Sequence, residues 1–191
     1  MSEILHPGFI LILVGVLAMI APKCIRKFIL AFGPLAGIYA AYNLQVGMEW
    51  NITFVHGYQL GIIYVDKLSW IFAFIFSILA LICGMYAASN PNRMEALCGM
   101  VYAGGAISVV LAHEWLTFIF FWESLAISSL FLVWCRNTKI SRRAGFRYLL
   151  VHMLGGNLLL AGIFLHMGAG GDPCLANLVA GPHDYSYWFI F

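Results

Sequence analysis

Residues 115–135 read WLTFIFFWESLAISSLFLVWC, an apolar run of membrane-spanning length with a single acidic side chain, Glu123, near its middle. A helix needs about 20 apolar residues to cross the hydrocarbon core of a membrane, because the core is about 30 Å thick and each residue advances about 1.5 Å. A carboxylate inside that core costs about 3 kcal/mol by insertion scales, so such residues usually face protein or water and mark an ion or proton path. Glu123 is therefore the first candidate for a functional centre.

The composition extends this interpretation to the whole chain. Of its 191 residues 63% are hydrophobic and only 9% are charged, whereas about 25% are charged in a typical soluble domain. We expect an all-α integral membrane protein that forms a single membrane domain over residues 1–191. Six transmembrane helices are predicted, and a seventh helix begins near residue 185. The six lie at about residues 8–21, 28–44, 68–88, 96–112, 115–135 and 146–167.

The distribution of basic residues predicts the orientation. Lysine and arginine concentrate in alternate loops, at Lys23, Arg26, Lys27, Arg93, Arg136, Lys139, Arg142, Arg143 and Arg147. By the positive-inside rule these loops are cytoplasmic and the N-terminus lies outside. We therefore expect a multi-pass protein of a bacterial or archaeal cytoplasmic (inner) membrane. In the outer loop, the alternating and aromatic-rich residues 50–64 predict a short hairpin, with a segment lying on the membrane surface as the alternative.

Polar residues of the fifth and sixth predicted helices fall at matching depths. These helices are antiparallel, and counting inward from the loop between them places Glu123 level with Asn157, and Ser128 level with His152 about 10 Å deep. A step of five residues is about 7.5 Å, which suits a bridging water. The four side chains are predicted to form a hydrated line from mid-membrane toward the cytoplasm. Alternatively, Ser128 and Asn157 join helices by hydrogen bonds and His152 is a satisfied interior histidine.

Such a glutamate can load and release a proton. Burial raises the pKa of a carboxyl group and a nearby cation lowers it, so a cation that approaches or withdraws shifts the proton equilibrium. Apart from Arg147 in the first turn of the sixth, at its cytoplasmic end, the six predicted helices contain no lysine or arginine, so we expect that cation beyond residue 191 or on another subunit. Three other acidic residues begin predicted helices and are interpreted as caps, with an outer proton gate as the alternative for the first: Glu114, Glu95 and Asp66.

Three segments, in this order, resemble the antiporter-like subunits of the complex I superfamily: DKLS at 66–69, HEWLTFIFFWESL at 113–125 and RAGFRYLLVH at 143–152. That family includes large membrane subunits of NADH:quinone oxidoreductase, the A and D subunits of multi-subunit sodium/proton antiporters, and subunits of membrane-bound hydrogenases. The resemblance implies that Glu123 stands at the family's essential glutamate, which pairs with a lysine on the seventh helix. It also implies proton translocation, coupled to redox chemistry elsewhere or to sodium exchange.

The chain departs from the family pattern in two respects. Lys67 stands where family members usually have a glycine, and His113 with Glu114 replaces an acidic residue with a small neighbour. Family members are also more than twice as long. We therefore expect membrane subunits as partners, including one that supplies the later helices, or else that the chain is a relic scaffold.

Two other functions compete with transport. A structural or assembly subunit would keep the helices without conducting. A b-type cytochrome is suggested by His152 and His166, which are fourteen residues apart on one predicted helix. The five cysteines are scattered with no Cys-x-x-Cys pair, and no glycine-rich nucleotide motif occurs. We thus expect no cofactor, no metal, no nucleic-acid partner and no redox chemistry of the chain's own.

Overall fold

The computed structural model describes residues 6–53, 59–89, 92–175 and 187–190. These residues form helices joined by short turns, with one two-stranded hairpin. In chain order the elements are α1 (Pro7–Ile20), α2 (Lys23–Tyr42), β1 (Glu49–Thr53), β2 (Gln59–Tyr64), α3 (Lys67–Ser89), α4 (Arg93–Val110), α5 (Trp115–Trp134), α6 (Lys139–Gly168) and α7 (Tyr187–Ile190).

All six predicted helices are present, but three of them begin earlier than the apolar runs indicated. α2 begins at Lys23, α4 at Arg93 and α6 at Lys139. Hydropathy marks the apolar part of a helix, whereas the backbone hydrogen bonds continue through charged residues to the cap. At α6 the cap is a reciprocal pair in which Thr138 and Ser141 each accept from the other's backbone N–H. The predicted start of the seventh helix at 185 lies outside the described residues.

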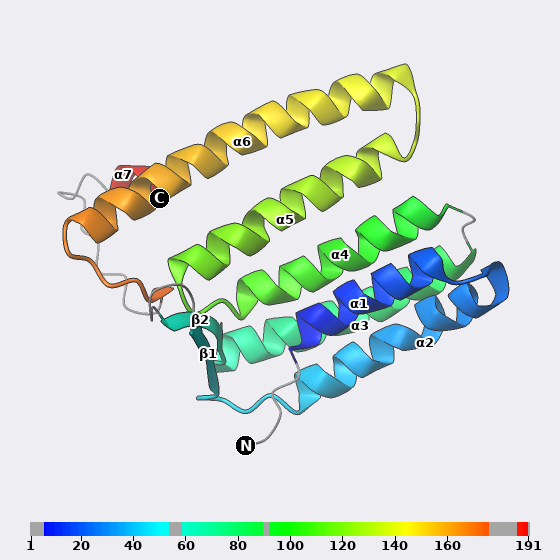
Figure 1. Cartoon of the computed structure of the whole chain (residues 1–191), viewed down its shortest axis with the longest axis horizontal. Helices are drawn as coiled ribbons and strands as arrows, with labels where there is room; N and C mark the ends of the chain where they lie inside the picture. Colours follow the sequence, from blue (N-terminus) through cyan, green and yellow to red (C-terminus); the bar gives the residue numbers. More distant parts are fainter. Residues whose placement is uncertain (1–5, 54–58, 90–91, 176–186, 191) are drawn as a thin grey trace.

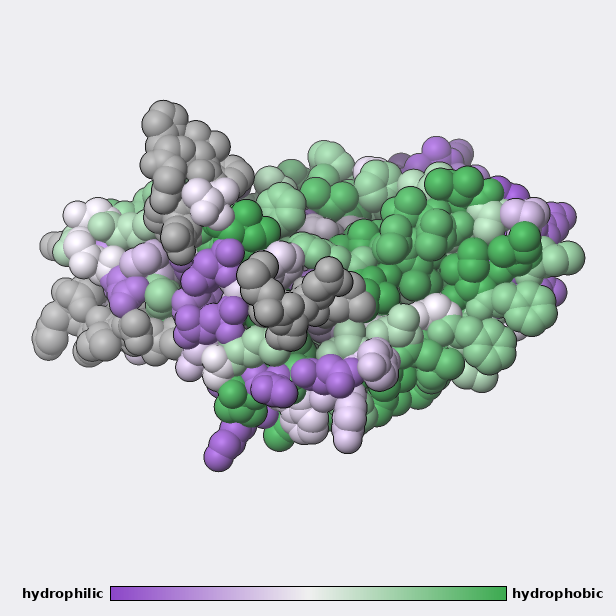
Figure 2. Space-filling view, turned by 60° about the horizontal axis from the view of Figure 1, so that its bottom comes forward, coloured by the Kyte–Doolittle hydropathy of each residue, from purple (hydrophilic) through white to green (hydrophobic). Residues whose placement is uncertain are grey.

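Four helices are long and apolar enough to cross a membrane by length and composition: α2, α3, α5 and α6. Helix α1 is apolar but has only 14 residues, which cover about 21 Å at the helical rise. Helix α4 has 18 residues and carries Glu95 in its first turn. Figure 2 shows the matching surface, with hydrophobic residues between hydrophilic residues that gather toward the two ends. The described residues thus form a mostly helical, multi-pass membrane fold.

The helices run side by side along one axis, and α6 lies at the edge of the bundle beside α5 (Figure 1). The α1–α2, α3–α4 and α5–α6 connections share one end, and the hairpin lies at the other end. Helix α1 packs against α4 at a very close approach. A side chain at Gly104 would collide with the carbonyl oxygen of Gly8, so glycine is required there.

The predicted hairpin is confirmed. Strands β1 and β2 pair antiparallel, with an irregularity in register between Trp50 and Asn51. The hairpin is tied to the start of α5, because the Thr117 hydroxyl donates to the carbonyl oxygen of Gly61 at 2.9 Å. Its last residue, Tyr64, donates its N–H to Leu111 at 2.9 Å. The hairpin therefore fixes the end of the bundle at which α5 begins.

Asp66 caps α3 as predicted. Its carboxylate accepts from the N–H of Ser69 at 2.5 Å, and its own N–H donates to the Ser69 hydroxyl at 2.8 Å. Both of these hydrogen bonds satisfy backbone donors that a helix start leaves free. The hydrogen bonds from Ser69 lower the pKa of the Asp66 carboxyl group below its usual value.

Candidate functional site

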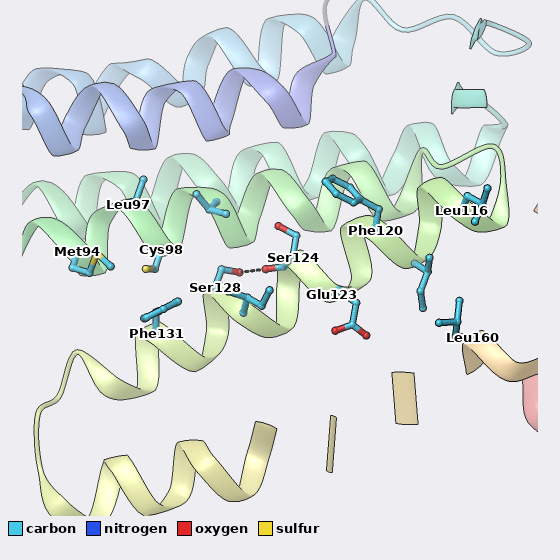
Figure 3. A pocket seen from close by; sticks show the side chains of 13 residues that line it. Met94, Leu97, Cys98, Leu116, Phe120, Glu123, Ser124, Ser128, Phe131 and Leu160 are labelled. Carbon is cyan, nitrogen blue, oxygen red and sulfur yellow. Dashed lines mark hydrogen bonds between the residues drawn. The ribbon is translucent and has the colours of Figure 1, made fainter. Parts of the chain in front are cut away.

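Glu123 lies on the side of α5 that meets α6. Its side chain is half-buried, and one carboxylate oxygen occupies the space that a side chain at Gly156 would fill. Gly156 is buried, so the missing side chain at this position gives the carboxylate its place against the α6 backbone. Figure 3 shows the carboxylate on the side of α5 opposite the α4 residues Met94 and Cys98.

Two further contacts give the same register between α5 and α6. The hydroxyl groups of Ser129 and Tyr148 are 2.8 Å apart and share a hydrogen bond. Near the loop, a side chain at Gly145 would collide with the indole nitrogen of Trp134. Because the three contacts follow one antiparallel alignment, Glu123 is level with Gly156 and so within one residue of the depth predicted for Asn157.

Glu123 also lines a groove of about 720 Å³ between α4 and α5. The groove follows α5 from Leu116 to Phe131, which is about 22 Å at the helical rise. Glu123 is the only charged residue in its lining, and the other polar groups are Ser124, Ser128 and Cys98. Glu123 thus lines this mostly apolar groove partway along its length with the carboxylate turned toward α6, and further polar groups extend toward the basic end of the bundle (Figure 3).

Ser128 shares this groove but does not join helices. Its hydroxyl donates within α5, to the carbonyl oxygens of Ser124 at 2.8 Å and Leu125 at 3.0 Å. The hydroxyl oxygen keeps its lone pairs as acceptors for a water in the groove. Among the serines of α5, Ser129 supplies the hydrogen bond between helices, through Tyr148.

His152 and Asn157 lie outside this groove. The His152 ring lies near two aromatic rings, Trp122 at a centroid distance of 5.9 Å and Tyr148 at 5.7 Å. Its Nε2 atom is buried and has no hydrogen-bond partner among the described residues. Asn157 is exposed, and its amide donates to the carbonyl oxygen of Met153 at 2.8 Å. The structure therefore places Glu123 and Ser128 in one groove, with His152 and Asn157 on the neighbouring helix.

Within the described part of the chain, Glu123 forms no ion pair or hydrogen bond. The basic residues of α2, α4 and α6 lie at one end of the bundle, in or near the first turns of their helices. The carboxylate is thus held in place by the helix packing around it and by the space at Gly156, without a cation from the described residues.

A contact at the hairpin end was not predicted from the sequence. The sulfur of Cys174 lies 3.6 Å from Nε2 of His113, and burial raises the pKa of the Cys174 thiol. No sequence signal connects these residues, because they are 61 positions apart. The described residues contain no group of three or more histidine, cysteine or acidic side chains that could hold a metal ion.

The expected capping role of Glu114 is wrong. Its side chain makes no capping hydrogen bond, although it is the N-cap residue of α5 and only 7% exposed. Backbone groups of residues 173–175 pair with the start of the helix instead. Pro173 accepts from the N–H of Trp115 at 3.1 Å, and Glu114 pairs with Cys174 through a backbone bridge.

The two histidines that suggested a b-type cytochrome, His152 and His166, have different surroundings. His152 lies near Trp122 and Tyr148, whereas His166 is buried beneath the turn that ends α6. A side chain at Gly171 would collide with the His166 ring. Within the part of the chain that the structure describes, the Nε2 atom of each ring lacks a hydrogen-bond partner. Aromatic residues and backbone therefore occupy the space around these rings.

The fold resembles that of a chain in a solved membrane complex. It matches a chain of the membrane-bound sulfane sulfur reductase, an archaeal respiratory membrane complex, with a TM-score of 0.71 and 22% sequence identity. The match covers 90% of this chain and 28% of that chain.

The sequence comparisons are more specific. Residues 112–189, which include all four predicted site residues, match the family described as NADH:quinone oxidoreductase/Mrp antiporter, TM. Subunit A1 of a Na⁺/H⁺ antiporter from Staphylococcus haemolyticus (strain JCSC1435) is 27% identical over 137 residues, which is 68% of this chain and 17% of that relative. The chain thus spans under a fifth of that relative's length. The predicted resemblance is confirmed: the chain is similar to antiporter-like membrane subunits of the complex I superfamily.

Proposed function

We propose that this chain is a proton-translocating membrane subunit of a multi-subunit respiratory or antiporter complex, with Glu123 as its intramembrane proton carrier. The observation that carries the proposal is the position of Glu123, a half-buried residue that lines an elongated groove and holds its carboxylate against α6, without a described cation beside it. An ionisable group in that position is costly, so a functional role is the expected reason for it.

The proposed cycle follows from the electrostatics of a carboxyl group in apolar surroundings. In the proposed cycle, Glu123 takes up a proton from water in the groove while no cation is nearby. When a lysine or arginine from a neighbouring membrane helix approaches, the ionised form is favoured and the proton leaves. Ser128 offers a hydroxyl oxygen to a water between Glu123 and the basic end of the bundle.

We place His152 and Asn157 on the exit side of this path. They lie on α6, on either side of Gly156, which the carboxylate contacts. A histidine exchanges protons near neutral pH, and the buried Nε2 atom of His152 has no other partner. A change in the side-chain conformation of Glu123, or a bridging water, would connect the groove to this second helix.

The proposal includes six spans, with the N-terminus outside and the basic end of the bundle in the cytoplasm of a bacterial or archaeal cell. Helix α1 is short for a span, so we expect local thinning of the bilayer around it. The partners are other membrane subunits, one of which supplies the cation for Glu123.

The test is proton translocation by the assembled complex, measured as acidification of sealed membrane vesicles. Glu123→Gln keeps the size of the side chain and removes its charge, so we expect the rate to fall tenfold or more, by about the contribution of one proton-transfer group. Glu49→Gln makes the same chemical change at an exposed position on β1 and should leave the rate unchanged.

A scaffold role is the second candidate. It is favoured by the hydrogen bonds that Ser128 and Asn157 make within their own helices, which leave less capacity for a water chain. If Glu123→Gln pumps at the wild-type rate while the complex assembles normally, the scaffold reading replaces the transport reading.

A further inference from the structure

The cations in the first two and a half turns of helix α6 all lie on one face. Lys139, Arg142, Arg143 and Arg147 are exposed, whereas Ser141 and Gly145 are buried against the bundle. At about 100° of rotation per residue, the four cations span about 140° of the helix surface, opposite those two buried residues. We call these four residues the basic face of α6.

The basic face lacks negative partners in the described part of the chain. No acidic residue occurs in the sequence between Glu123 and Asp172. The basic side chains form no ion pair with any described residue. Glu95, in the first turn of α4, is the described acidic residue at this end of the bundle. Four positive charges therefore face outward without compensation.

The same side of α6 continues directly into an exposed apolar surface. Leu150 is 56% exposed and Leu154 is 63% exposed, and the helical rotation places both within the arc of the cations. The level at which charge gives way to apolar side chains is marked by Trp134, whose indole contacts Gly145. Tryptophan concentrates at the membrane–water interface. A ligand of this surface would have an anionic head at that level and an apolar tail below it.

We propose that the basic face of α6, together with Leu150 and Leu154, is a binding site for an anionic phospholipid. The guanidinium groups of Arg142 and Arg143 match the geometry of a phosphate, which each can contact through two parallel N–H donors. The acyl chains lie along Leu150 and Leu154. An acidic protein surface would satisfy the charges but not the apolar continuation, and therefore fits less well.

The test is lipid retention by the purified full chain in micelles that contain equal amounts of phosphatidylglycerol and phosphatidylcholine, measured by native mass spectrometry. Wild type should retain phosphatidylglycerol preferentially. Arg142→Gln/Arg143→Gln should weaken that retention about thirtyfold, because each cation near an anionic lipid surface contributes a factor of about five. Lys23→Gln/Lys27→Gln removes two exposed charges at the same end of the bundle and should change it less than twofold.

A third variant separates binding from membrane topology, to which loop charges also contribute. Arg142→Lys/Arg143→Lys keeps the charges and removes the forked donors, so it should insert normally and bind phosphatidylglycerol severalfold less tightly than wild type. Inorganic phosphate should not displace the lipid, because it lacks the acyl chains. Equal retention of the two lipids by wild type, equal losses in both glutamine variants, or displacement by phosphate alone would each overturn the proposal. An acidic partner subunit as the true ligand would give the first of these results.

Discussion

An oxygen of Glu123 on α5 occupies the space that a side chain on Gly156 of α6 would fill. This contact places the only charged residue of the α4–α5 groove against the backbone of the next helix. Because α6 leaves room there, the carboxylate can sit between the two helices, within reach of water from the groove. The proposed transport function depends on that space.

Filling the space should therefore impair transport while leaving the carboxylate in the chain. Gly156→Ala adds a methyl group that collides with Glu123, so either α6 shifts or the carboxylate is displaced. We expect proton translocation to fall severalfold. Gly155→Ala is the matched control, because nothing lies within 4 Å of a side chain built at that position, and its vesicle acidification rate should equal that of wild type. Equal rates for both variants would show that the contact is incidental.

Replacing His152 by phenylalanine separates proton exchange from packing. The phenyl ring preserves the contacts with Trp122 and Tyr148 and removes the ring nitrogens. Since the buried Nε2 atom has no partner to lose, thermal stability should stay within about 0.5 kcal/mol of wild type. The proposed relay requires that proton translocation fall. An unaltered rate would return His152 to a packing role.

The hydrogen bond between Ser129 and Tyr148 should stabilise the α5–α6 pair. A double-mutant cycle of Ser129→Ala and Tyr148→Phe, measured by unfolding in mixed micelles, should give a coupling energy of about 0.6 kcal/mol, the average for such bonds between membrane helices. Ser128→Ala paired with Tyr148→Phe serves as the control, because Ser128 bonds only within α5. Its coupling energy should be near zero, and a coupling equal to that of Ser129 would mean that the assigned partner is wrong.

The capping hydrogen bonds of Asp66 at the start of α3 should make the stability of the protein depend on pH. Hydrogen bonds from Ser69 lower the pKa of its carboxyl group from the ordinary value of 3.8. A group with a lowered pKa in the folded state stabilises the fold above its unfolded pKa, and that contribution disappears as the pH falls through the folded value. Wild type should therefore lose stability below pH 3.8 relative to Asp66→Asn, which keeps a capping oxygen that does not titrate. Thermal unfolding from pH 5 to pH 2 of both proteins, in the same detergent, measures this difference, and parallel curves would contradict it.

The sequence was sufficient for what depends on local pattern. Continuous apolar runs located the six helices, and alternation over residues 50–64 located the hairpin. Counting along two antiparallel helices placed Glu123 within one residue of its observed level on α6. The charged starts of α2, α4 and α6 were missed, because the helical hydrogen bonds begin several residues before the apolar run does.

The rotation of each helix about its axis could not be obtained in the same way. It places Ser128 in the groove and directs the Asn157 amide to its own backbone, and it depends on how all neighbouring helices pack together. The contact between Cys174 and His113 is likewise a product of tertiary structure. His113 precedes α5 and Cys174 follows α6, so the contact joins two loop segments that are 61 positions apart in the sequence.

The most direct test of the central claim is whether Glu123 exchanges a proton within the membrane. Infrared difference spectroscopy of the assembled complex in lipid, titrated with acid, detects the carbonyl stretch of a protonated carboxyl group and its shift in D₂O. The account predicts a band that appears on acidification, shifts in D₂O and is absent in Glu123→Gln but present in Glu49→Gln. A band unchanged by Glu123→Gln, or no exchange with D₂O, would contradict it.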